Sequence, residues 1–225
     1  MYVLIGGAGL VGLSLAQKLV ELNHTVAVID IDPTACRYAR EQVGVMAFEG
    51  SAVSTEVLMD AGIRKADALA AVLRSDALNL AMVTLAKHYG VPQIVARMRH
   101  RDFMEPFQLS GASHIISTVD LAVSTMVSAI EYPQVESMMH FEQGQIEILK
   151  LSVPQDCYIA GHSVAEIAQD AKFPSGSLMI GYQSHPHDDL IIPNGSTILE
   201  PGGKLLVVTK PGAVHQLVDF IESCK

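Results

Sequence analysis

The first 116 residues of the chain repeat one pattern of apolar and polar positions. A short apolar run rich in valine and isoleucine is followed by a turn, and then by a segment in which apolar residues recur every three or four positions. Nearly continuous apolar runs are typical of strands buried on both faces of a parallel sheet, and the wider spacing is typical of amphipathic helices. The pattern therefore predicts six strands, at Tyr2–Ile5, Thr25–Ile29, Val45–Phe48, Ala68–Val72, Gln93–Ala96 and His114–Ile116.

The helical spacing is clearest at Leu10–Leu22 and at Asp76–Tyr89. Strands that alternate with helices are joined by right-handed crossovers, so this part is expected to be an α/β domain with a Rossmann-like, doubly wound parallel sheet. One more helix is predicted at Asp120–Ile130, with Ser117 and Thr118 as candidate caps.

Beyond Gln145 the pattern changes to strands with polar alternation and turn-rich connections. Strands are predicted for "IEILKLSV", "SLMIGYQ", "DLIIP" and "KLLVVT", and helices for "HSVAEIAQ" and "AVHQLVDFIES". This order predicts a second, smaller α+β domain. The boundary is expected between residues 137 and 144, where Gln143-Gly144 interrupts the pattern, which gives domains at 1–140 and 141–225.

A glycine-rich run follows the first predicted strand and opens the first predicted helix. Gly7 permits the tight turn out of the strand, Gly9 lets a pyrophosphate approach the backbone, and Gly12 lets the helix pack against the sheet. Phosphates would then face the free N–H groups at the start of that helix. The run therefore predicts a dinucleotide-type phosphate site, made by Gly7, Ala8, Gly9, Leu10, Val11 and Gly12.

An acidic residue stands at the end of the second predicted strand, in "TVAVIDID". Asp30 is placed to accept hydrogen bonds from both hydroxyls of an adenosine ribose, and Ile31 and Asp32 follow it. A carboxylate there disfavours a 2′-phosphate, so the expected ligand is NAD(H) or an adenine mononucleotide and not NADP. Asp32 also suits the N-cap of a helix that begins at Pro33, and both roles stay open.

Ligands of doubly wound sheets gather at the carboxyl ends of the strands. Residues just after the later strands are therefore further candidates to line the adenine and the phosphates. Arg97 would meet a phosphate or pair with a neighbouring acid. The full set of these candidates is Ser51, Ala52, Leu73, Arg74, Ser75, Asn79 and Arg97.

Charge and composition exclude several classes of function. The formal net charge is −9 and there is no basic run, so neither nucleic acid nor an anionic membrane surface is an expected direct partner. No apolar run reaches the roughly 20 residues of a membrane span, and the N-terminal stretch has no basic leader, so a soluble cytoplasmic protein is expected. The three cysteines, Cys36, Cys157 and Cys224, have no C-x-x-C spacing and are expected to be reduced thiols.

The same motifs in this order resemble those of the RCK/KTN family of cytoplasmic nucleotide-binding regulators of potassium channels and Trk/Ktr-type transporters. The resemblance runs through Gly50-Ser51-Ala52, Ser75-Asp76-x-x-Asn79 and Ala96-Arg97 in the first domain. It continues through "GHSVAEI" and "LIIPNGSTILEPGGKLLVV" in the second, so it covers nearly the whole chain. It implies an N-terminal KTN domain and a C-terminal RCK domain.

The chain departs from the family pattern at several positions. Ser51 replaces the acid that helps to read the adenine, Leu10 replaces an arginine that reaches a neighbouring subunit's phosphate, and Val119 replaces a glutamate at a cation site. Ala77 replaces another acid of the pattern. These departures argue against switching by the γ-phosphate of ATP, and the expected ligand remains NAD(H) or an adenine mononucleotide (AMP, ADP or ATP).

The resemblance also implies partners. It implies homodimers formed across the helix at about Asp120–Pro133, an octameric ring of such dimers, and docking of that ring at the inner face of the membrane under a potassium transporter or channel. A second effector is implied for the C-terminal domain, where Ile191, Ile192, Pro193 and Asn194 are the nearest candidates.

No catalytic constellation accompanies the glycine run. His24, His88, His100 and His114 have no evident acid–base partner in the sequence, so the chain is expected to sense the nucleotide and not to react it. "SHPHDD" at His185 suits a hairpin loop better than a metal site. A small NAD-dependent oxidoreductase, and a regulator of another cation transporter such as an antiporter, remain the alternatives.

Overall fold

The structure is a computed structural model that describes residues 1–141 and 145–223. The chain divides into two compact units, Met1–Leu121 and Ala122–Lys225. Each unit has its own sheet and its own apolar core.

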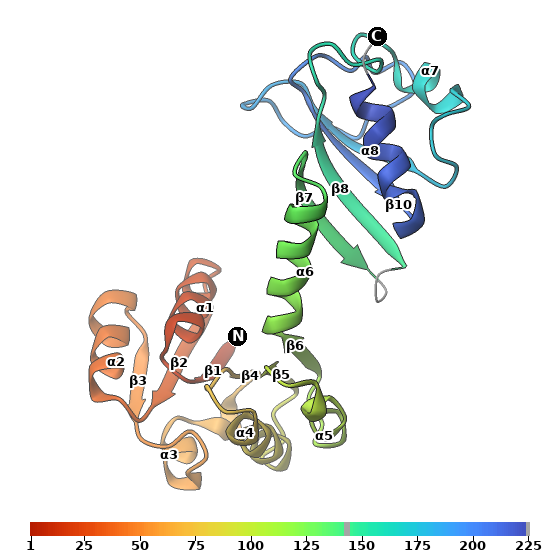
Figure 1. Cartoon of the computed structure of the whole chain (residues 1–225). Coiled ribbons are helices and arrows are strands. Elements are labelled where there is room, and N and C mark those ends of the chain that lie inside the picture. Colours follow the sequence, from red (N-terminus) through yellow and green to blue (C-terminus); the bar gives the residue numbers. More distant parts are fainter. Residues whose placement is uncertain (142–144, 224–225) are drawn as a thin grey trace. The chain divides into compact units, whose positions relative to one another are not determined.

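The first unit is built on a six-stranded sheet in the order β3-β2-β1-β4-β5-β6, and every neighbouring pair is parallel (Figure 1). The order reverses between β1 and β4, as in other doubly wound sheets. The predicted fold class is therefore confirmed. The strands are β1 (Tyr2–Gly6), β2 (Thr25–Asp30), β3 (Met46–Glu49), β4 (Ala68–Ala71), β5 (Gln93–Met98) and β6 (His114–Ser117).

Helices cover both faces of this sheet. One core forms between the sheet and α1, α2 and the π-helical turn η1, and a second forms between the sheet and α3, α4 and α5. The apolar strand residues divide between these cores, which explains why the strands read as continuous apolar runs. The helices are α1 (Leu10–Glu21), α2 (Pro33–Tyr38), η1 (Ala39–Val43), α3 (Thr55–Asp60), η2 (Ile63–Lys65), α4 (Asp76–His88), η3 (Arg101–Phe103) and α5 (Met104–Leu109).

The second unit holds an antiparallel sheet in the order β7-β8-β10-β9, packed against α8 (Figure 1). Leu149, Leu205 and Leu217 are fully buried in its core. Its strands are β7 (Val135–Phe141), β8 (Ile146–Ser152), β9 (Leu178–Gln183) and β10 (Lys204–Thr209). Its helical elements are α7 (Val164–Gln169), η5 (Pro211–Ala213) and α8 (Val214–Glu222), and α6 (Thr118–Glu131) begins in the first unit and continues into the second.

The second unit differs from the sequence prediction in two elements. β7 was not predicted, although it pairs with β8 over most of its length. The predicted strand "DLIIP" is no strand, because only one bridge, between Ile191 and Tyr182, joins it to β9.

The boundary between the units also differs from the expected one. The division by contacts falls between Leu121 and Ala122, whereas the sequence placed it between residues 140 and 141. β7, most of which the sequence assigned to the first domain, belongs to the second sheet. The dipeptide Gln143-Gly144, on which the expected boundary rested, lies outside the described residues.

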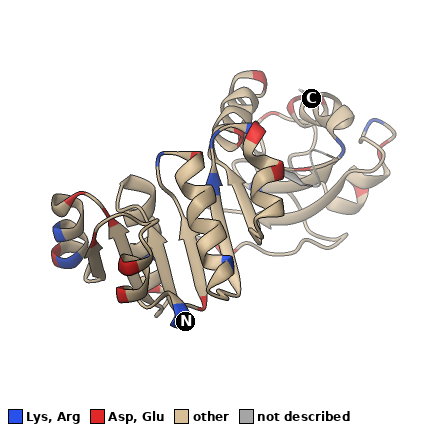
Figure 2. Cartoon of the chain, turned by 90° about the horizontal axis from the view of Figure 1, so that it is seen from below, with Lys and Arg blue, Asp and Glu red and all other residues tan. Residues whose placement is uncertain are grey.

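None of the described helices has the length and apolar character that a bilayer crossing requires. Acidic and basic residues are interspersed over both units (Figure 2). Cys36 and Cys157 are buried free thiols, and Cys224 lies outside the described residues.

Candidate functional site

The glycine run forms the turn between β1 and α1. Gly7 has φ +109°, a conformation that residues with a side chain rarely adopt. A Cβ at Gly12 would lie 1.8 Å from the Gly7 carbonyl oxygen, so the helix packs against the turn as closely as a glycine allows. A Cβ at Gly9 would meet no described atom within 4 Å, so the backbone there is open to an approaching group.

The first turn of α1 presents backbone N–H groups at this opening. Gly9 is the N-cap of α1, and among the described residues no side chain caps it. By contrast, Asp32 caps α2 and Ser75 caps α4. The start of a helix carries unpaired N–H groups and a partial positive charge, which together favour an anion such as a phosphate. The turn therefore fits the phosphates of a nucleotide.

Asp30 fixes the glycine turn through its carboxylate. One carboxylate oxygen accepts a hydrogen bond of 2.6 Å from the Ala8 backbone N–H, and the other accepts one of 2.9 Å from the Asp32 N–H. Each carboxylate oxygen has two acceptor sites, so capacity for ribose hydroxyls remains. The sequence did not indicate this structural role, because the approach of Ala8 to Asp30 depends on the pairing of β1 with β2.

Asp32 and Ile31 occupy the loop that follows β2. The Asp32 carboxylate accepts a hydrogen bond of 2.8 Å from the Thr34 N–H and so caps α2. The Ile31 side chain is 76% exposed. Below this loop, the buried Cys36 thiol lies 3.5 Å from the Asp30 carbonyl oxygen, and burial raises the pKa of the thiol, which keeps it neutral.

Asn79 connects the ends of two strands. Its side-chain oxygen accepts a hydrogen bond of 2.8 Å from the Leu73 N–H, and its amide group donates to the carbonyl oxygens of Leu73 and Arg97 at 3.1 and 3.0 Å. Asn79 is fully buried, so the structure does not place it among the residues open to a ligand. It acts instead as a clamp that fixes Leu73 and Arg97 at the carboxyl edge of the sheet.

Asp76 makes a second clamp beside the first, a structural role that the sequence did not indicate. Asp76 is 5% exposed, and its carboxylate accepts hydrogen bonds from the backbone N–H groups of Arg99 and His100. The neighbouring Ser75 caps α4 through the Leu78 N–H, and Arg74 is exposed with its carbonyl oxygen bound to Arg99. Asp76 thus fixes the turn after β5 to the start of α4.

Two further candidates, Ser51 and Ala52, follow β3. Ser51 is exposed, and its hydroxyl accepts a long hydrogen bond of 3.4 Å from the Val53 N–H. Ala52 is 4% exposed and packs in the core between the sheet and α4. The Gly50 N–H, just before them, bonds to the Asp30 carbonyl oxygen at 2.9 Å, which brings this loop to the end of β2.

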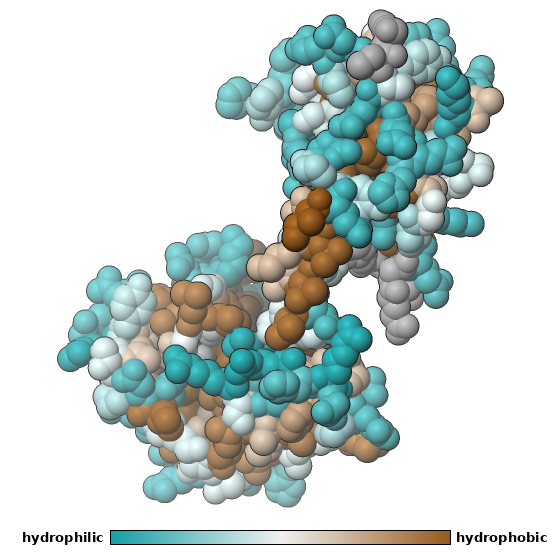
Figure 3. Space-filling model, in the orientation of Figure 1, coloured by the Kyte–Doolittle hydropathy of each residue, from teal (hydrophilic) through white to brown (hydrophobic). Residues whose placement is uncertain are grey.

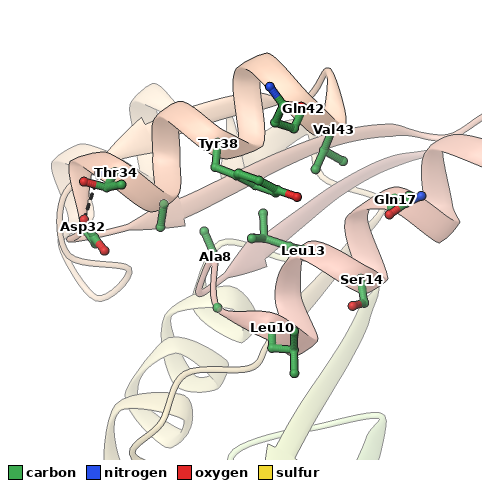
Figure 4. A pocket seen from close by; sticks show the side chains of 12 residues that line it. Ala8, Leu10, Leu13, Ser14, Gln17, Asp32, Thr34, Tyr38, Gln42 and Val43 are labelled. Carbon is green, nitrogen blue, oxygen red and sulfur yellow. Dashed lines mark hydrogen bonds between the residues drawn. The ribbon is translucent and has the colours of Figure 1, made fainter.

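A pocket of about 490 Å³ begins at the glycine turn and runs between α1 and α2 (Figure 4). Of the predicted residues it contains Ala8, Gly9, Leu10 and Asp32. The other predicted residues do not line it: Gly7, Val11, Gly12, Asp30, Ile31, Ser51, Ala52, Leu73, Arg74, Ser75, Asn79 and Arg97. The remaining lining residues are Leu13, Ser14, Gln17, Thr34, Ala35, Tyr38, Gln42 and Val43. The structure therefore brings part of the glycine turn and the loop after β2 together at one concavity, and the candidates from β3, β4 and β5 stand along the same sheet edge beyond it.

Within residues 1–141 and 145–223, no group of three or more histidine, cysteine or acidic side chains is arranged to hold a metal ion. In the "SHPHDD" segment, His185 and Ser184 both contact the Asp188 carboxylate, at 3.2 and 2.7 Å. These contacts close an exposed loop.

Comparison with known proteins identifies two family domains in this chain. Residues 3–118 match the TrkA-N domain and residues 148–222 match the TrkA-C domain. A Trk system potassium uptake protein TrkA homolog from Methanothermobacter thermautotrophicus is 31% identical over 216 residues, which cover 96% of this chain and 97% of that protein. A TrkA homolog from Pyrococcus abyssi is 30% identical over 229 residues, with 99% and 98% covered.

Solved structures share the fold. The GsuK channel bound to NAD matches with a TM-score of 0.66 at 21% identity, over all of this chain and 40% of the channel chain. The Kef CTD of Shewanella denitrificans in its AMP-bound form matches with a TM-score of 0.52 at 25% identity, over 60% of this chain and 84% of that one. This chain thus spans about two fifths of the channel that it resembles.

Proposed function

Since this chain belongs to the TrkA family through its TrkA-N and TrkA-C domains, we propose that it is a regulatory subunit that binds an adenine nucleotide and thereby gates a membrane potassium transporter or channel. The main observation in favour of nucleotide binding is the geometry of the turn after β1. Its helix start has free N–H groups, its Gly9 is open to approach, and Asp30 stands beside it.

Each part of a nucleotide has candidate partners in the first unit. The phosphates would bind at Gly7–Gly12, with Arg97, Arg74 and Ser75 further along the same sheet edge. The ribose would bind at Asp30, and Ile31, Ser51, Ala52 and Leu73 would border the base. Asp30 disfavours a 2′-phosphate, so the proposed ligand is NAD(H), AMP, ADP or ATP. The related structures with NAD, ADP and AMP bound support this class.

The nucleotide is proposed to be sensed and not reacted. The candidate site has backbone N–H groups, arginines and the carboxylates of Asp30 and Asp32, which hold the turn and cap α2, but the residues named for it include no acid–base pair placed for hydride or proton transfer. A sensing role requires only that the ligand bind two conformations with different affinity.

The proposed quaternary structure is a homodimer that assembles into a ring. All fourteen residues of α6 are described and none of them is buried. Large apolar side chains on this helix are exposed, among them Val123 at 52%, Met126 at 64% and Ile130 at 80% (Figure 3). An apolar face of this extent marks an interaction site, and a second copy of α6 is the proposed occupant. The ring would lie at the inner face of the membrane, bound to its transporter.

Calorimetric titration of the full chain with NAD, NADH, AMP, ADP and ATP tests the nucleotide site. We expect at least one of these ligands to bind, and Gly9→Ala to weaken that binding at least tenfold, because the added methyl group occupies the phosphate approach. Asp30→Ala is a poorer probe, because it also removes two hydrogen bonds that hold the turn. If none of the five ligands bound the wild-type chain, the proposal would be wrong.

Co-reconstitution with its transporter in liposomes tests the regulatory part. We expect potassium flux to change when the binding nucleotide is added, and the Gly9→Ala variant to lose that response. Oxidation of NADH with small carbonyl substrates would instead favour the alternative of a small NAD-dependent oxidoreductase.

A further inference from the structure

Arg97 has an unusual environment at the end of β5. The residue is half-buried, and its Nε donates a hydrogen bond of 3.2 Å to the Thr118 hydroxyl. Among the described residues, no carboxylate lies within ion-pair distance of its guanidinium. A partly buried cation normally has a counter-charge, so this position favours an anion that the chain itself does not supply.

The register of the sheet places Arg97 in line with the glycine turn. Gly6 pairs with Ala71, and Ala71 pairs with Ala96, so Gly7, Val72 and Arg97 follow in the next row. Two strand spacings, roughly 10 Å, separate the backbone of Arg97 from that of Gly7. Asn79 holds the Arg97 carbonyl oxygen, so the backbone from which this side chain extends is fixed.

Thr118 is the first residue of α6, and its hydroxyl is not needed to cap the helix. Ser117 performs that function, since its hydroxyl accepts a hydrogen bond of 3.3 Å from the Asp120 N–H. The Asp120 carboxylate in turn pairs with Arg101 at 3.1 Å. Two arginines four residues apart, Arg97 at the end of β5 and Arg101 after it, are thus bound to the first turn of α6.

We propose that Thr118 is a positioning residue of the nucleotide site: its hydroxyl holds the Arg97 guanidinium so that the remaining N–H groups face a phosphate at the glycine turn. A guanidinium has five N–H donors, and one of them is used by Thr118, so a pair remains for bidentate contact with an anion. This inference rests on the proposed nucleotide site, and it identifies Thr118 as the residue that connects this site to α6.

The arrangement couples the ligand to the helix. A phosphate that fixes the guanidinium also strengthens the contact between Arg97 and Thr118. By linkage, any change that fixes the first turn of α6 must raise the affinity for the phosphate by the same factor. The division between the two units falls after Leu121, so the coupled turn is the last part of the first unit. The ligand would therefore act on the segment that continues into the second unit.

Substitution of Thr118 separates this role from a structural one. Thr118→Val keeps the shape and removes the hydroxyl, and Thr118→Ser keeps the hydroxyl. We expect Thr118→Val to raise the Kd of the binding nucleotide about three- to tenfold, as loss of one hydrogen bond to a charged group implies. Thr118→Ser should restore the wild-type Kd, and Arg97→Lys should weaken binding at least as much as Thr118→Val, because an ammonium cannot make both contacts.

Adenosine is the control ligand, because it has the ribose and the base but no phosphate. Its affinity should be equal in the wild type and in Thr118→Val. Hydrogen exchange gives a second readout: the nucleotide should slow exchange in the first turn of α6 in the wild type and in Thr118→Ser, but not in Thr118→Val.

The outcomes distinguish this inference from the proposed function. If the wild-type chain binds no adenine nucleotide, the proposed function itself fails. If a nucleotide binds and Thr118→Val leaves its Kd and the exchange of α6 unchanged, the site stands and the positioning role is wrong. Equal weakening of adenosine and of the nucleotide would also overturn it, since it would show general damage to the site.

Discussion

At the scale of single residues, the glycines at positions 9 and 12 have opposite surroundings. Gly9 has extended backbone and open space where a Cβ would be, whereas Gly12 faces the Gly7 carbonyl oxygen. A side chain at position 9 would therefore obstruct only an incoming group, and one at position 12 would disturb the turn itself. Within the glycine run, we thus expect Gly9 to be required for binding and Gly12 for folding.

A matched pair of substitutions tests this separation. Gly12→Ala should lower the free energy of unfolding by about 1–3 kcal/mol or more, because the turn and the helix must move apart to admit the methyl group. Gly9→Ala should change it by less than about 1 kcal/mol and still weaken nucleotide binding. Urea unfolding of both variants measures the stabilities. Comparable destabilisation by the two would contradict this account of the turn.

The clamp at Asn79 gives a second prediction at this scale. In Asn79→Asp, a carboxylate would face the carbonyl oxygens of Leu73 and Arg97 in a buried position, which should cost about 3–5 kcal/mol. Removal of the cap in Ser75→Ala, in the same turn, should cost only about 1 kcal/mol. Urea midpoints compared at constant m-value measure both changes. A cost near that of Ser75→Ala would mean that Asn79 is not a clamp.

The sequence located these residues better than it explained them. The turn at Gly7, Gly9 and Gly12 could be predicted because the spacing of these glycines reflects local turn geometry. The place of Asp30 at the end of β2 could be predicted from the apolar run before it, but its hydrogen bond from Ala8 could not. Asn79 was expected to face the ligand, and it faces backbone instead. An asparagine that binds a ligand and one that binds backbone have the same sequence context after a strand. Only the pairing of β5 with β4 decides which groups lie within hydrogen-bond distance of the amide.

At the scale of elements, the six strands of the first sheet followed directly from their apolar runs. β7 did not, because a register shift between Val135 and Ser137 breaks the alternation of its side chains. At residues 190–192 a strand was predicted where the structure has none. This segment is apolar but exposed, with Ile192 at 87%, so its hydrophobicity does not reflect a place in the sheet.

The start of α6 permits a prediction about pH. Arg101 and the Ser117 hydroxyl hold the pKa of the Asp120 carboxyl below its ordinary value. Because the folded pKa is lowered, the contribution of this carboxylate to stability is present above its unfolded pKa, about 3.9, and is lost as the pH falls through the lower folded value. Arg101→Gln should therefore raise the titration midpoint of Asp120 toward the ordinary value.

The carbon chemical shift of the Asp120 carboxyl, followed by NMR, measures that midpoint. Lys18→Gln is the control, since Lys18 pairs with Glu21 on α1 and should leave Asp120 unaffected. An unchanged midpoint in Arg101→Gln would show that the ion pair at the start of α6 does not act on the carboxylate in solution.

At the scale of the whole molecule, the sequence predicted two domains and their order, because the change from βα alternation to strands with polar alternation is visible in the chain itself. It placed α6 wholly with the first domain. The later part of α6 belongs to the second unit, where Val127 and Glu131 line one pocket with Met138 and Pro211. Such contacts arise between segments far apart in sequence, so no local pattern could have shown them.

The exposed apolar face of α6 leads to a prediction about dimer formation. If a second copy covers this face, a charge placed on it must be buried without a partner on association, which is costly. Ile130→Asp should therefore convert the dimer to a monomer, as measured by light scattering with size-exclusion chromatography. Leu109→Asp is the matched control, because Leu109 on α5 is 81% exposed against 80% for Ile130 but lies on another helix. A dimer that survives Ile130→Asp would place the interface elsewhere, and a wild-type chain that is already monomeric would remove the proposed partner from α6.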